Sequence, residues 1–577
     1  MKTESKIVII GGTACGPKTA ARARRCDPHA KITIIEQSEY LSSATCGFPY
    51  YVGGMIKERT SLDVVKPGLF KSAYNIDVFT NTRAVEINRG EQKVRVVNVA
   101  SGESRSVRYD KLVIATGSLP IKLSCEGHEL GGIYPLWTML DAVNVRRLVD
   151  QRKIKKAVVV GSGLIGLEVA EALVAQGLWV TMIEALDWLL PKLIDFEIAA
   201  YAERHLKKQG LDLLLGTRVI SFEGQDGWVK KVITDRKEVD TDLVILAVGT
   251  RPNVKLAAEA GIEIGKIGGI SVHSNLQTND PNIYAGGDCV ENINRITLKK
   301  TFVPMGSTAN KHGRIIGTNI TGGHETFPGV LGTTVAKAFD YNVARVGLTE
   351  SQATDEGYLH ETCLIPGLDH AAYYPGAKKM LLKLIVDKKT RMILGAQGVG
   401  EGEVAKRIDV LATAISFGAK IDDVADLDLG YAPPYNSAMD PVHHAANVIR
   451  NKLSGMAEAC TPTEVKKRID GGEEFILLDV RSLKEKENCC IDATKQTRLI
   501  PLPDLRTRLE EIPKEAEIMI YCQTSIRAYR AQRILTEKGF RNVKFMDGGI
   551  AAWPYETLGV KPYADQSGLP IALETEI

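Results

Sequence analysis

The sequence lacks a long apolar run and lacks a strong excess of charge of either sign. None of its apolar stretches is long enough to cross a bilayer, and the short polar segment Met1 to Lys6 leads directly into a strand-like run instead of a secretory signal. Lys and Arg number 73 and Asp and Glu number 70, which gives a net charge of +3. The composition therefore predicts no membrane partner and no nucleic-acid partner, although a local basic cluster can still bind a phosphorylated ligand.

The ten cysteines lack the spacing of a disulfide framework or of a zinc site. This pattern predicts a reducing cytoplasm, no metal centre, and thiols that are either reactive or buried. Cys46 is the most informative of them, because no second cysteine follows within several residues, and its sulfur partner is therefore expected to come from outside the chain. Most of the scattered others are expected to be packing residues: Cys15, Cys26, Cys125, Cys289, Cys363 and Cys460.

At 577 residues the chain is too long for one core and predicts several domains. The first begins with an apolar strand at 6–10, a glycine turn at 11–16, a helix at 17–25 and a strand at 32–35 that ends at Glu36. Gly11, Gly12 and Gly16 let the backbone approach a pyrophosphate, and Glu36 suits a ribose hydroxyl. Thr13 replaces the middle glycine of the dinucleotide motif, so an ordinary strand–helix turn is the alternative.

A second dinucleotide signal is complete. The strand 156–160 leads into Gly161, Gly163 and Gly166, then a helix at 167–176 and a strand at 179–183 that ends at Glu184. Glu184 suits the adenine ribose hydroxyls and repels a 2′-phosphate, which favours NADH, with NADPH possible if a basic side chain lies nearby.

A third signal is the strand that ends in Gly287-Asp288, where Asp288 suits a ribityl hydroxyl. Two further strand-end turns carry Thr116-Gly117 and Gly249. Any one of these turns alone can be an ordinary strand end. All of them in this order on one chain are not expected by chance.

Residues 1 to about 450, with these turns in this order, resemble the FAD- and NAD(P)H-dependent pyridine nucleotide–disulfide oxidoreductases. The segment from Ser42 to Tyr51, Ser-x-x-x-Cys-Gly-x-Pro-Tyr-Tyr, resembles the single-cysteine branch with its CoA-disulfide reductases, NADH-dependent persulfide reductases and NADH oxidases or peroxidases. The resemblance implies FAD, NADH and coenzyme A as cofactors and Ser42 as part of the flavin site. Cys46 at a helix entrance beside the flavin is expected to be stabilised as a thiolate.

The resemblance also implies a homodimer in which tyrosines reach across to the active cysteine, and by position these are Tyr373 and Tyr431. A phenol can protonate a departing thiolate. The alternative is that these aromatic residues fill the dimer interface. Arg22 and Arg25, on the first helix, are the expected contacts to CoA phosphates, with a solvated basic face as the alternative.

The C-terminal region predicts a small α/β domain with a strand at 518–521, a loop from Cys522 to Arg527 and a helix at 528–538. Such a joint points backbone N–H groups at the sulfur, which is expected to lower the pKa of the Cys522 thiol. Asp479-Val480-Arg481, the loop and Gly548-Gly549-x-x-x-Trp553 resemble a rhodanese, which implies Cys522 and Arg527 as catalytic residues. The segment 489–494 departs from the rhodanese pattern, and the alternatives are a phosphatase-type loop or an inactive rhodanese fold.

The predicted fold is therefore α/β, with two Rossmann-like domains for FAD and NAD(P)H, an α+β dimerisation domain and a C-terminal α/β rhodanese domain. The expected boundaries are 1–150 and 271–325 for the two parts of the FAD domain, 151–270 for the NAD(P)H domain, 326–450 for dimerisation, 451–462 for a linker and 463–577 for the rhodanese domain.

The predicted activity is NADH-dependent reduction of persulfide or polysulfide sulfur, with CoA-persulfide the expected substrate, to a thiol and hydrogen sulfide. Cys522 is expected to accept sulfane sulfur and pass it toward Cys46. The alternatives are a CoA-disulfide reductase, an NADH oxidase or peroxidase that cycles Cys46 through a sulfenic acid, and a non-redox sulfur-binding module.

Overall fold

The computed structural model describes residues 4–493 and 496–559, and the chain divides into two compact units. The first unit comprises residues 1–185 and 217–330, and the second comprises residues 186–216 and 331–577. Residues 186–216, expected in the NAD(P)H domain, thus group with the second unit. Within the described residues, none of the helices has both the length and the apolar character needed to cross a bilayer.

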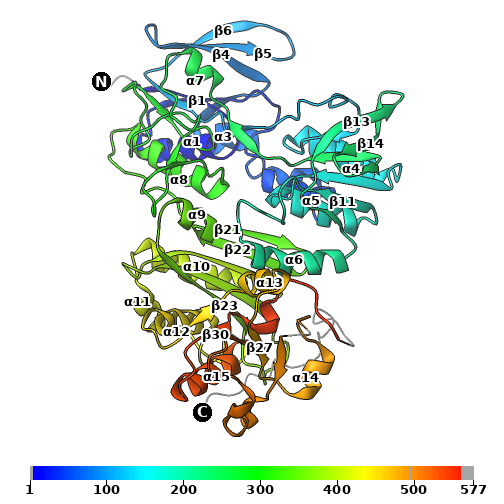
Figure 1. Ribbon diagram of the computed structural model, residues 1–577. Coiled ribbons are helices and arrows are strands. Elements are labelled where there is room, and N and C mark those ends of the chain that lie inside the picture. The colour runs from blue at the N-terminus through cyan, green and yellow to red at the C-terminus, as the bar shows by residue number, and fades with distance from the viewer. Residues whose placement is uncertain (1–3, 494–495, 560–577) are drawn as a thin grey trace. The chain divides into compact units, whose positions relative to one another are not determined.

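The first unit opens with a parallel sheet in the order β18-β7-β1-β2-β3 (Figure 1). Its strands are β1 (Lys6–Ile10), β2 (Lys31–Ile35), β3 (Ile76–Phe79), β7 (Lys111–Ile114) and β18 (Ile283–Ala285). On the central strand β1, Ile7 and Ile9 point to one face and Val8 and Ile10 to the other, and all four are at most 5% exposed, as expected for a sheet covered on both faces. Helices α1 (Cys15–Cys26) and α8 (Gly306–Asn319) pack against each other, and β4 (Thr82–Asn88), β5 (Lys93–Asn98) and β6 (Ser104–Arg108) form an antiparallel sheet.

A second dinucleotide fold in the same unit has the strand order β11-β10-β16-β9. Its elements are β9 (Ile133–Tyr134), α4 (Met139–Asp150), β10 (Lys156–Val160), α5 (Leu164–Ala175), β11 (Trp179–Ile183) and β16 (Leu243–Leu246). An antiparallel sheet of β13 (Val219–Gln225), β14 (Trp228–Thr234) and β15 (Glu238–Asp240) follows β11 along the chain. The short helix α2 (Phe48–Val52) packs against α4 and α5, so the segment after Cys46 lies on this second fold.

The second unit contains an antiparallel sheet in the order β21-β22-β25-β24-β23. The strands are β21 (Thr334–Ala338), β22 (Tyr341–Gly347), β23 (His360–Leu368), β24 (Lys379–Asp387) and β25 (Ile393–Gly400). The helices of this region are α6 (Phe196–Lys208), α9 (Glu350–Asp355), α10 (Val404–Ser416), α11 (Ile421–Ala425) and α12 (Pro441–Leu453). β24 and β25 are buried along almost their whole length, because helices cover the sheet.

The C-terminal region of the second unit is a parallel sheet in the order β26-β30-β29-β27-β28. Its elements are β26 (Ala459–Cys460), α13 (Pro462–Asp470), β27 (Ile476–Asp479), α14 (Leu483–Asn488), β28 (Thr497–Leu499), β29 (Ile518–Tyr521), α15 (Ile526–Glu537) and β30 (Val543–Met546). The expected linker 451–462 therefore contains the last turn of α12 and the edge strand β26.

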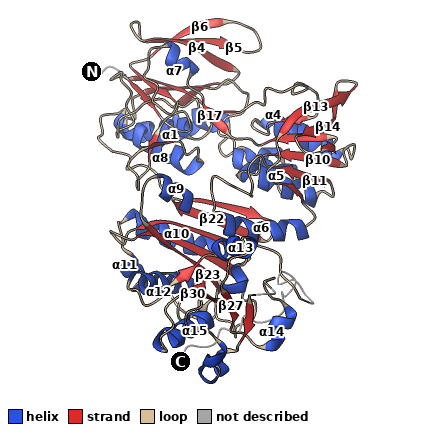
Figure 2. Cartoon of the chain, in the orientation of Figure 1, coloured by secondary structure: helices blue, strands red, loops and turns tan. Residues whose placement is uncertain are grey.

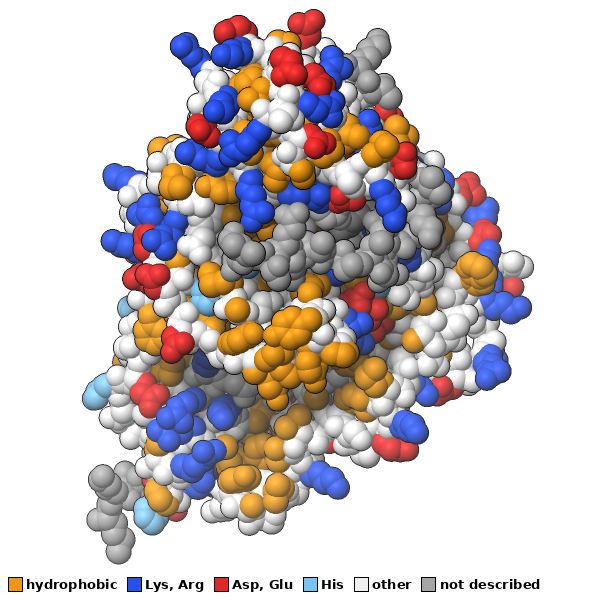
Figure 3. All heavy atoms as spheres, turned by 90° about the horizontal axis from the view of Figure 1, so that it is seen from below, with side chains coloured by type: hydrophobic (Ala, Val, Ile, Leu, Met, Phe, Trp, Pro, Cys, Tyr) orange, Lys and Arg blue, Asp and Glu red, His pale blue; other side chains and the backbone are white. Residues whose placement is uncertain are grey.

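Both units combine helices with strands, as the predicted α/β class requires (Figure 2). Strands and helices alternate in the C-terminal region from β26 to β30. On the face drawn in Figure 3, Lys and Arg are interspersed with Asp and Glu, and they do not gather into one basic field. Thr494 and the end of the expected rhodanese domain, 560–577, lie outside the described residues.

Candidate active site

The first glycine turn fits a dinucleotide phosphate. Gly11 has φ +113°, and a Cβ there would lie 2.0 Å from the carbonyl oxygen of Ala115. A Cβ on Gly16 would lie 1.9 Å from the carbonyl oxygen of Gly11. Both positions therefore require glycine, which brings the backbone between β1 and the start of α1 into the tight turn that a pyrophosphate needs.

Two residues hold this turn in place, Glu36 through its side chain and Ser42 through its backbone. Glu36, directly after β2, accepts hydrogen bonds from the backbone N–H groups of Gly12 and Ser38, both at 2.8 Å. Ser42 has a positive φ of 55°, which is uncommon for a residue with a side chain, and its N–H donates to the carbonyl oxygen of Gly12 at 2.6 Å. Glu36 and Ser42 thus both contact Gly12 of the turn for which the sequence predicts FAD binding.

The second glycine turn has the same construction. A Cβ on Gly166 would lie 2.1 Å from the carbonyl oxygen of Gly161, whose φ is +99°. A Cβ on Gly163 would find only the carbonyl oxygen of Ala247, at 3.9 Å, so the space before Gly163 is open for a phosphate. Glu184, directly after β11, accepts from both the backbone N–H and the hydroxyl of Ser162, at 2.9 Å and 2.7 Å.

Asp288 lies beyond β18, after Gly287, which has φ +83°. Burial raises the pKa of its carboxyl group, while the Ser118 hydroxyl donates to it at 3.2 Å and opposes that rise. A half-buried carboxylate in this place can accept from a hydroxyl-rich chain such as a ribityl group.

The turn at 116–117 and the turn that begins at Gly249 are hydrogen-bonded to each other. The hydroxyl of Thr116 donates to the carbonyl oxygen of Asn253 at 2.7 Å, and the N–H of Asn253 donates to Gly117 at 2.9 Å. Gly117 and Gly249 both have positive φ, 65° and 102°, and lie next to the short antiparallel pair β8 (Ser118–Pro120) and β17 (Thr250–Pro252). The contact joins the two dinucleotide folds of the first unit.

Cys46 lies in a single 3₁₀ turn, Thr45–Gly47, directly before α2, and its side chain reaches solvent. The helix entrance agrees with the sequence prediction, but the pKa does not. Surrounding protein raises the pKa of the thiol, and the negative charge of Glu168 raises it further. Desolvation and a nearby carboxylate therefore outweigh the dipole of so short a helix.

Glu168 is a site residue that the sequence did not predict. It lies on α5, two positions after Gly166, and its Oε1 accepts from the Tyr50 hydroxyl at 3.2 Å. Burial raises the pKa of Glu168, and burial together with Glu168 raises the pKa of Tyr50 to about 12. The only sequence signals were its position just after the glycine motif and the spacing of four residues from Cys46 to Tyr50.

Tyr373 and Tyr431, in the second unit, lie side by side. Their hydroxyl oxygens are 3.3 Å apart, and the side chains are 75% and 52% exposed. The N–H of Ala371 donates to the carbonyl oxygen of Pro433 and holds the two segments together. The sequence predicts a role for each tyrosine separately, and in the fold their hydroxyl groups form one hydrogen-bonded pair.

Arg22 and Arg25 of α1 differ in their contacts with the rest of the chain. Arg22 donates to the Thr318 hydroxyl at 2.9 Å and lies 3.6 Å from Glu325, so it is already engaged within the chain. Arg25 is exposed and donates to the carbonyl oxygen of Ala21 on its own helix. Of the two, Arg25 is the more accessible to an anionic ligand.

Cys522 lies at the end of β29 and is 1% exposed. The N–H of Ala528 donates to its Sγ at 3.4 Å, and this contact, with Arg527 and the N–H groups of Thr524 and Ser525, lowers the thiol pKa as expected. Burial is the larger effect, and the net shift of the Cys522 pKa is upward, contrary to the prediction from sequence.

Arg527 is held by Glu485 of α14 through two hydrogen bonds of 3.0 Å and 2.6 Å. Although burial opposes the shift, the contacts with Arg527 and Ser482 lower the pKa of Glu485 to about 2. In the segment that departs from the rhodanese pattern, the carbonyl oxygen of Cys489 accepts from Arg481 at 2.8 Å. The replacement segment is therefore joined to the Asp479–Arg481 ion pair of 2.8 Å.

Comparison with known proteins places these features in a family. Residues 5–306 match the description "Pyridine nucleotide-disulphide oxidoreductase", residues 333–442 match its dimerisation domain, and residues 461–555 match "Rhodanese-like domain". These ranges agree with the predicted order of domains. Cys46 falls within the first match and Cys522 within the third, in the first and second units respectively.

Two curated relatives cover most of the chain. A "NAD(P)H sulfur oxidoreductase (CoA-dependent)" of Pyrococcus abyssi is 39% identical over 450 residues, which are 78% of this chain and 99% of that protein. A "Coenzyme A disulfide reductase" of Staphylococcus haemolyticus is 33% identical over 439 residues, 76% of this chain and 98% of that protein.

One solved structure extends over the C-terminal region as well. The NAD-dependent persulfide reductase from A. fulgidus is 43% identical, has a TM-score of 0.90, and covers 95% of this chain and 100% of that chain. The sequence prediction of a fused architecture is confirmed by this likeness.

Proposed function

The chain belongs to the pyridine nucleotide–disulphide oxidoreductase family, and from that premise we propose that it uses NADH to reduce persulfide or polysulfide sulfur, carried on coenzyme A, to a thiol and hydrogen sulfide. The family uses FAD and NAD(P)H, and the two glycine turns fit their phosphates because a Cβ at Gly11, Gly16, Gly161 or Gly166 would meet backbone. FAD, when bound, accepts hydride from the nicotinamide and supplies two electrons to sulfur.

The single observation that carries the proposal is the solvent-accessible thiol of Cys46, at the entrance of α2, on the same chain as a second candidate sulfur carrier, Cys522. No cysteine lies between Cys46 and Cys125 in the sequence, so an internal redox disulfide close to Cys46 along the chain is excluded. A chain that both receives sulfane sulfur and reduces it accounts for both cysteines.

The reaction balances as RSSH + NADH + H⁺ giving RSH + H₂S + NAD⁺. The thiolate of Cys46 attacks the outer sulfur of RSSH, the S–S bond breaks, and RSH leaves with a proton, so Cys46 carries the persulfide. Addition of two electrons and protonation releases sulfide and restores the thiolate. We assign protonation of the departing thiolate to the Tyr373–Tyr431 pair of the partner protomer in a homodimer.

Glu184, directly after β11, supports the preference for NADH, because a carboxylate there repels a 2′-phosphate. Arg25, assisted by Arg22, is proposed to contact CoA phosphates. Cys522 is proposed to accept sulfane sulfur from a donor and pass it toward Cys46, with Arg527 beside the loop as the cation that attracts an anionic donor. All ten cysteines are free thiols, which suits a reducing compartment, and we assign the enzyme to the cytoplasm.

The test is NADH oxidation coupled to sulfide release with CoA-persulfide as substrate. Cys46→Ser is expected to abolish it, and Cys522→Ser is expected to remove only the activity that starts from polysulfide. Undiminished turnover in Cys46→Ser would disprove the reductive half of the proposal, and an undiminished polysulfide reaction in Cys522→Ser would disprove the relay.

A CoA-disulfide reductase is the second candidate, favoured by the 33% identity to the staphylococcal relative. The same thiol would attack a CoA–CoA disulfide instead of a persulfide. The ratio of kcat/KM for CoA-persulfide and CoA disulfide distinguishes the two, and a higher value for the disulfide would replace our proposal.

A further inference from the structure

The second unit contains a buried ion pair that joins α12 to the rhodanese-like region. Lys452, near the end of α12, donates from Nζ to Oδ2 of Asp547 and to the carbonyl oxygen of Thr362, both at 2.6 Å. Glu361 lies 3.5 Å from the same amine. The side chains of Lys452 and Asp547 are only 5% and 4% exposed. Because desolvation offsets most of the attraction in such a pair, its main effect here is to fix one geometry.

Asp547 begins the segment that packs on the Cys522 loop. Directly before it, the carbonyl oxygen of Met546 accepts from the Ser525 hydroxyl at 3.1 Å. Three and four residues after it, the N–H of Ile550 donates to the carbonyl oxygen of Cys522 at 2.9 Å, and the N–H of Ala551 donates to that of Gln523 at 3.0 Å. These three hydrogen bonds therefore hold the segment against the loop.

Gly549 shows how close this approach is. Its φ is +57°, and a Cβ there would lie 2.6 Å from the carbonyl oxygen of Cys522. A small displacement of Asp547 is thus transmitted through backbone contacts to the sulfur-bearing residue, because no flexible side chain lies between them.

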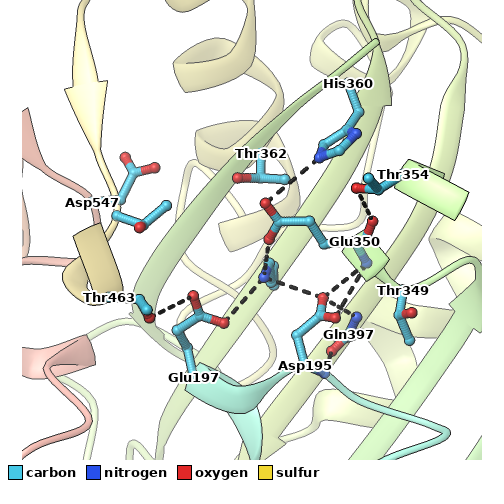
Figure 4. Close-up of polar contacts among 12 residues, drawn as sticks. Asp195, Glu197, Thr349, Glu350, Thr354, His360, Thr362, Gln397, Thr463 and Asp547 are labelled. Carbon is cyan, nitrogen blue, oxygen red and sulfur yellow. Dashed lines mark hydrogen bonds and ion pairs between the residues drawn. The ribbon is translucent and has the colours of Figure 1, made fainter. Parts of the chain in front are cut away.

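Other polar contacts hold the rhodanese-like region against the same sheet. Glu197 accepts from Lys383 of β24 at 3.1 Å and from Thr463 of α13 at 3.4 Å. Figure 4 shows the carboxylates of Asp195 and Glu197, both at the start of α6, converging with that of Glu350 on α9, and Thr463 lies beside Glu197. All three carboxylates lie within 3.1 Å of Nζ of Lys383. These contacts secure the region as a whole, whereas the Lys452–Asp547 pair acts directly on the segment that touches the loop. That segment also receives a backbone contact from Cys460 and packs against Leu364 of β23.

We propose that Lys452 is a positioning residue for sulfur transfer at Cys522, acting through Asp547 and the segment 547–551. The proposal rests on the proposed role of Cys522 as sulfur acceptor. Lys452 lies outside the rhodanese-like match at 461–555, so the sulfur loop depends on a residue that the rhodanese domain itself does not contain.

The Lys452–Asp547 pair predicts a specific pH dependence of sulfur transfer. Burial raises the pKa of Asp547 to about 6, against the opposing effect of Lys452. The other groups that face it are Glu361 and Cys363 on β23, Lys383 on β24 and Cys460 on β26. As the pH falls through about 6, Asp547 takes up a proton and its charge contact with Lys452 is lost. Sulfur transfer is therefore expected to decline on the acid side of that value.

The experiment uses the full-length, flavin-loaded enzyme and inorganic polysulfide with cyanide as acceptor, and measures thiocyanate. Lys452→Met and Asp547→Asn are expected to lower the rate at least tenfold and to leave NADH-dependent CoA-persulfide reduction within twofold. Lys388→Met is the matched control, because Lys388 also binds Glu361, at 2.9 Å, but is not among the residues that contact Asp547. Lys452→Arg is expected to restore part of the rate.

Two further readouts separate positioning from simple loss of folding. The native enzyme is expected to show an acid limb near pH 6 in thiocyanate formation that disappears in Asp547→Asn. The double variant Lys452→Met/Asp547→Asn removes both buried charges and is expected to fold, as judged by thermal unfolding, yet to remain slow. A folded double variant or a folded Lys452→Met with the native rate and pH profile would overturn the proposal.

A failure of the proposed sulfur relay through Cys522 gives a different result from a failure of the positioning claim. If the native enzyme forms no thiocyanate, the role of Cys522 in the proposed function is wrong. The alkylation rate of Cys522 by iodoacetamide, followed across pH by peptide mass spectrometry, then still decides the positioning claim. A shifted profile in Lys452→Met supports it, and an unchanged profile refutes it.

Discussion

The hydroxyl oxygens of Tyr373 and Tyr431 lie 3.3 Å apart although 58 residues separate the two tyrosines along the chain. Both rings are exposed, and the hydrogen bond from one phenol to the other raises the pKa of Tyr373. Two phenols that share a proton can deliver it to a departing thiolate as one unit, which neither could do as well alone.

Tyr373→Phe and Tyr431→Phe are therefore expected to lower kcat for CoA-persulfide by about 10²-fold each, and the double variant by little more than either single change. Steady-state kinetics on the three variants measures this. Tyr435→Phe, on the same exposed segment, is the control and is expected to keep native activity. Losses that simply multiply in the double variant would show that the tyrosines act independently.

Glu168 and Cys46 provide a second test. Because the carboxylate raises the pKa of the Cys46 thiol, Glu168→Gln is expected to lower that pKa and to increase the fraction of thiolate at neutral pH. The pH dependence of Cys46 alkylation measures it directly. Glu171→Gln, one turn along the same helix, is expected to cause a smaller change. An unchanged profile in Glu168→Gln would show that the two groups are not coupled.

Substitutions of Gly163 and Gly166 in the second glycine turn are expected to separate NADH binding from the stability of the fold. A methyl group at Gly163 would meet only Ala247 at 3.9 Å, so Gly163→Ala is expected to fold normally and to raise the KM for NADH on the order of tenfold. Gly166→Ala would place a methyl group 2.1 Å from the carbonyl oxygen of Gly161 and is expected to cost about 1–3 kcal/mol of stability. Thermal unfolding and NADH kinetics compare the pair, and equal destabilisation by both changes would contradict the assignment of the open space.

The Arg527–Glu485 pair gives a pH-dependent prediction. The pKa of Glu485 is lowered to about 2 in the folded state, below its ordinary value of 4.5, so its contribution to stability is complete above pH 4.5 and is lost as the pH falls toward 2. Glu485→Gln is expected to cost about 1–2 kcal/mol at neutral pH, after allowance for its partial exposure, and nothing near pH 2. Urea unfolding across pH measures the difference. Glu487→Gln, exposed on the same helix, is expected to have no such effect at any pH.

Much of the local structure followed from the sequence. The strands β1, β10, β11 and β29 have the predicted bounds, because short apolar runs between glycine turns leave few other possibilities. Three helices begin earlier than predicted: α1 starts at Cys15, two residues before Pro17, α5 starts at Leu164, and α15 starts at Ile526. Pro17 is tolerated there since the first turn of a helix does not require its missing N–H.

The electrostatic predictions were less successful. The helix entrances at Cys46 and Cys522 were expected to favour the thiolate, and the pKa of each thiol is instead raised, first by burial. Burial and the approach of Glu168 depend on residues distant in the chain, which no local motif reports.

The sequence alone determined the order of domains, the positions of the two glycine turns and the two cysteines that we propose as sulfur carriers, because each depends on neighbours along the chain. Tertiary structure decided which distant residues meet: Tyr50 with Glu168, Tyr373 with Tyr431, and Lys452 with Asp547. Such pairs form only when whole elements pack, and the same packing sets the burial that governs their charge.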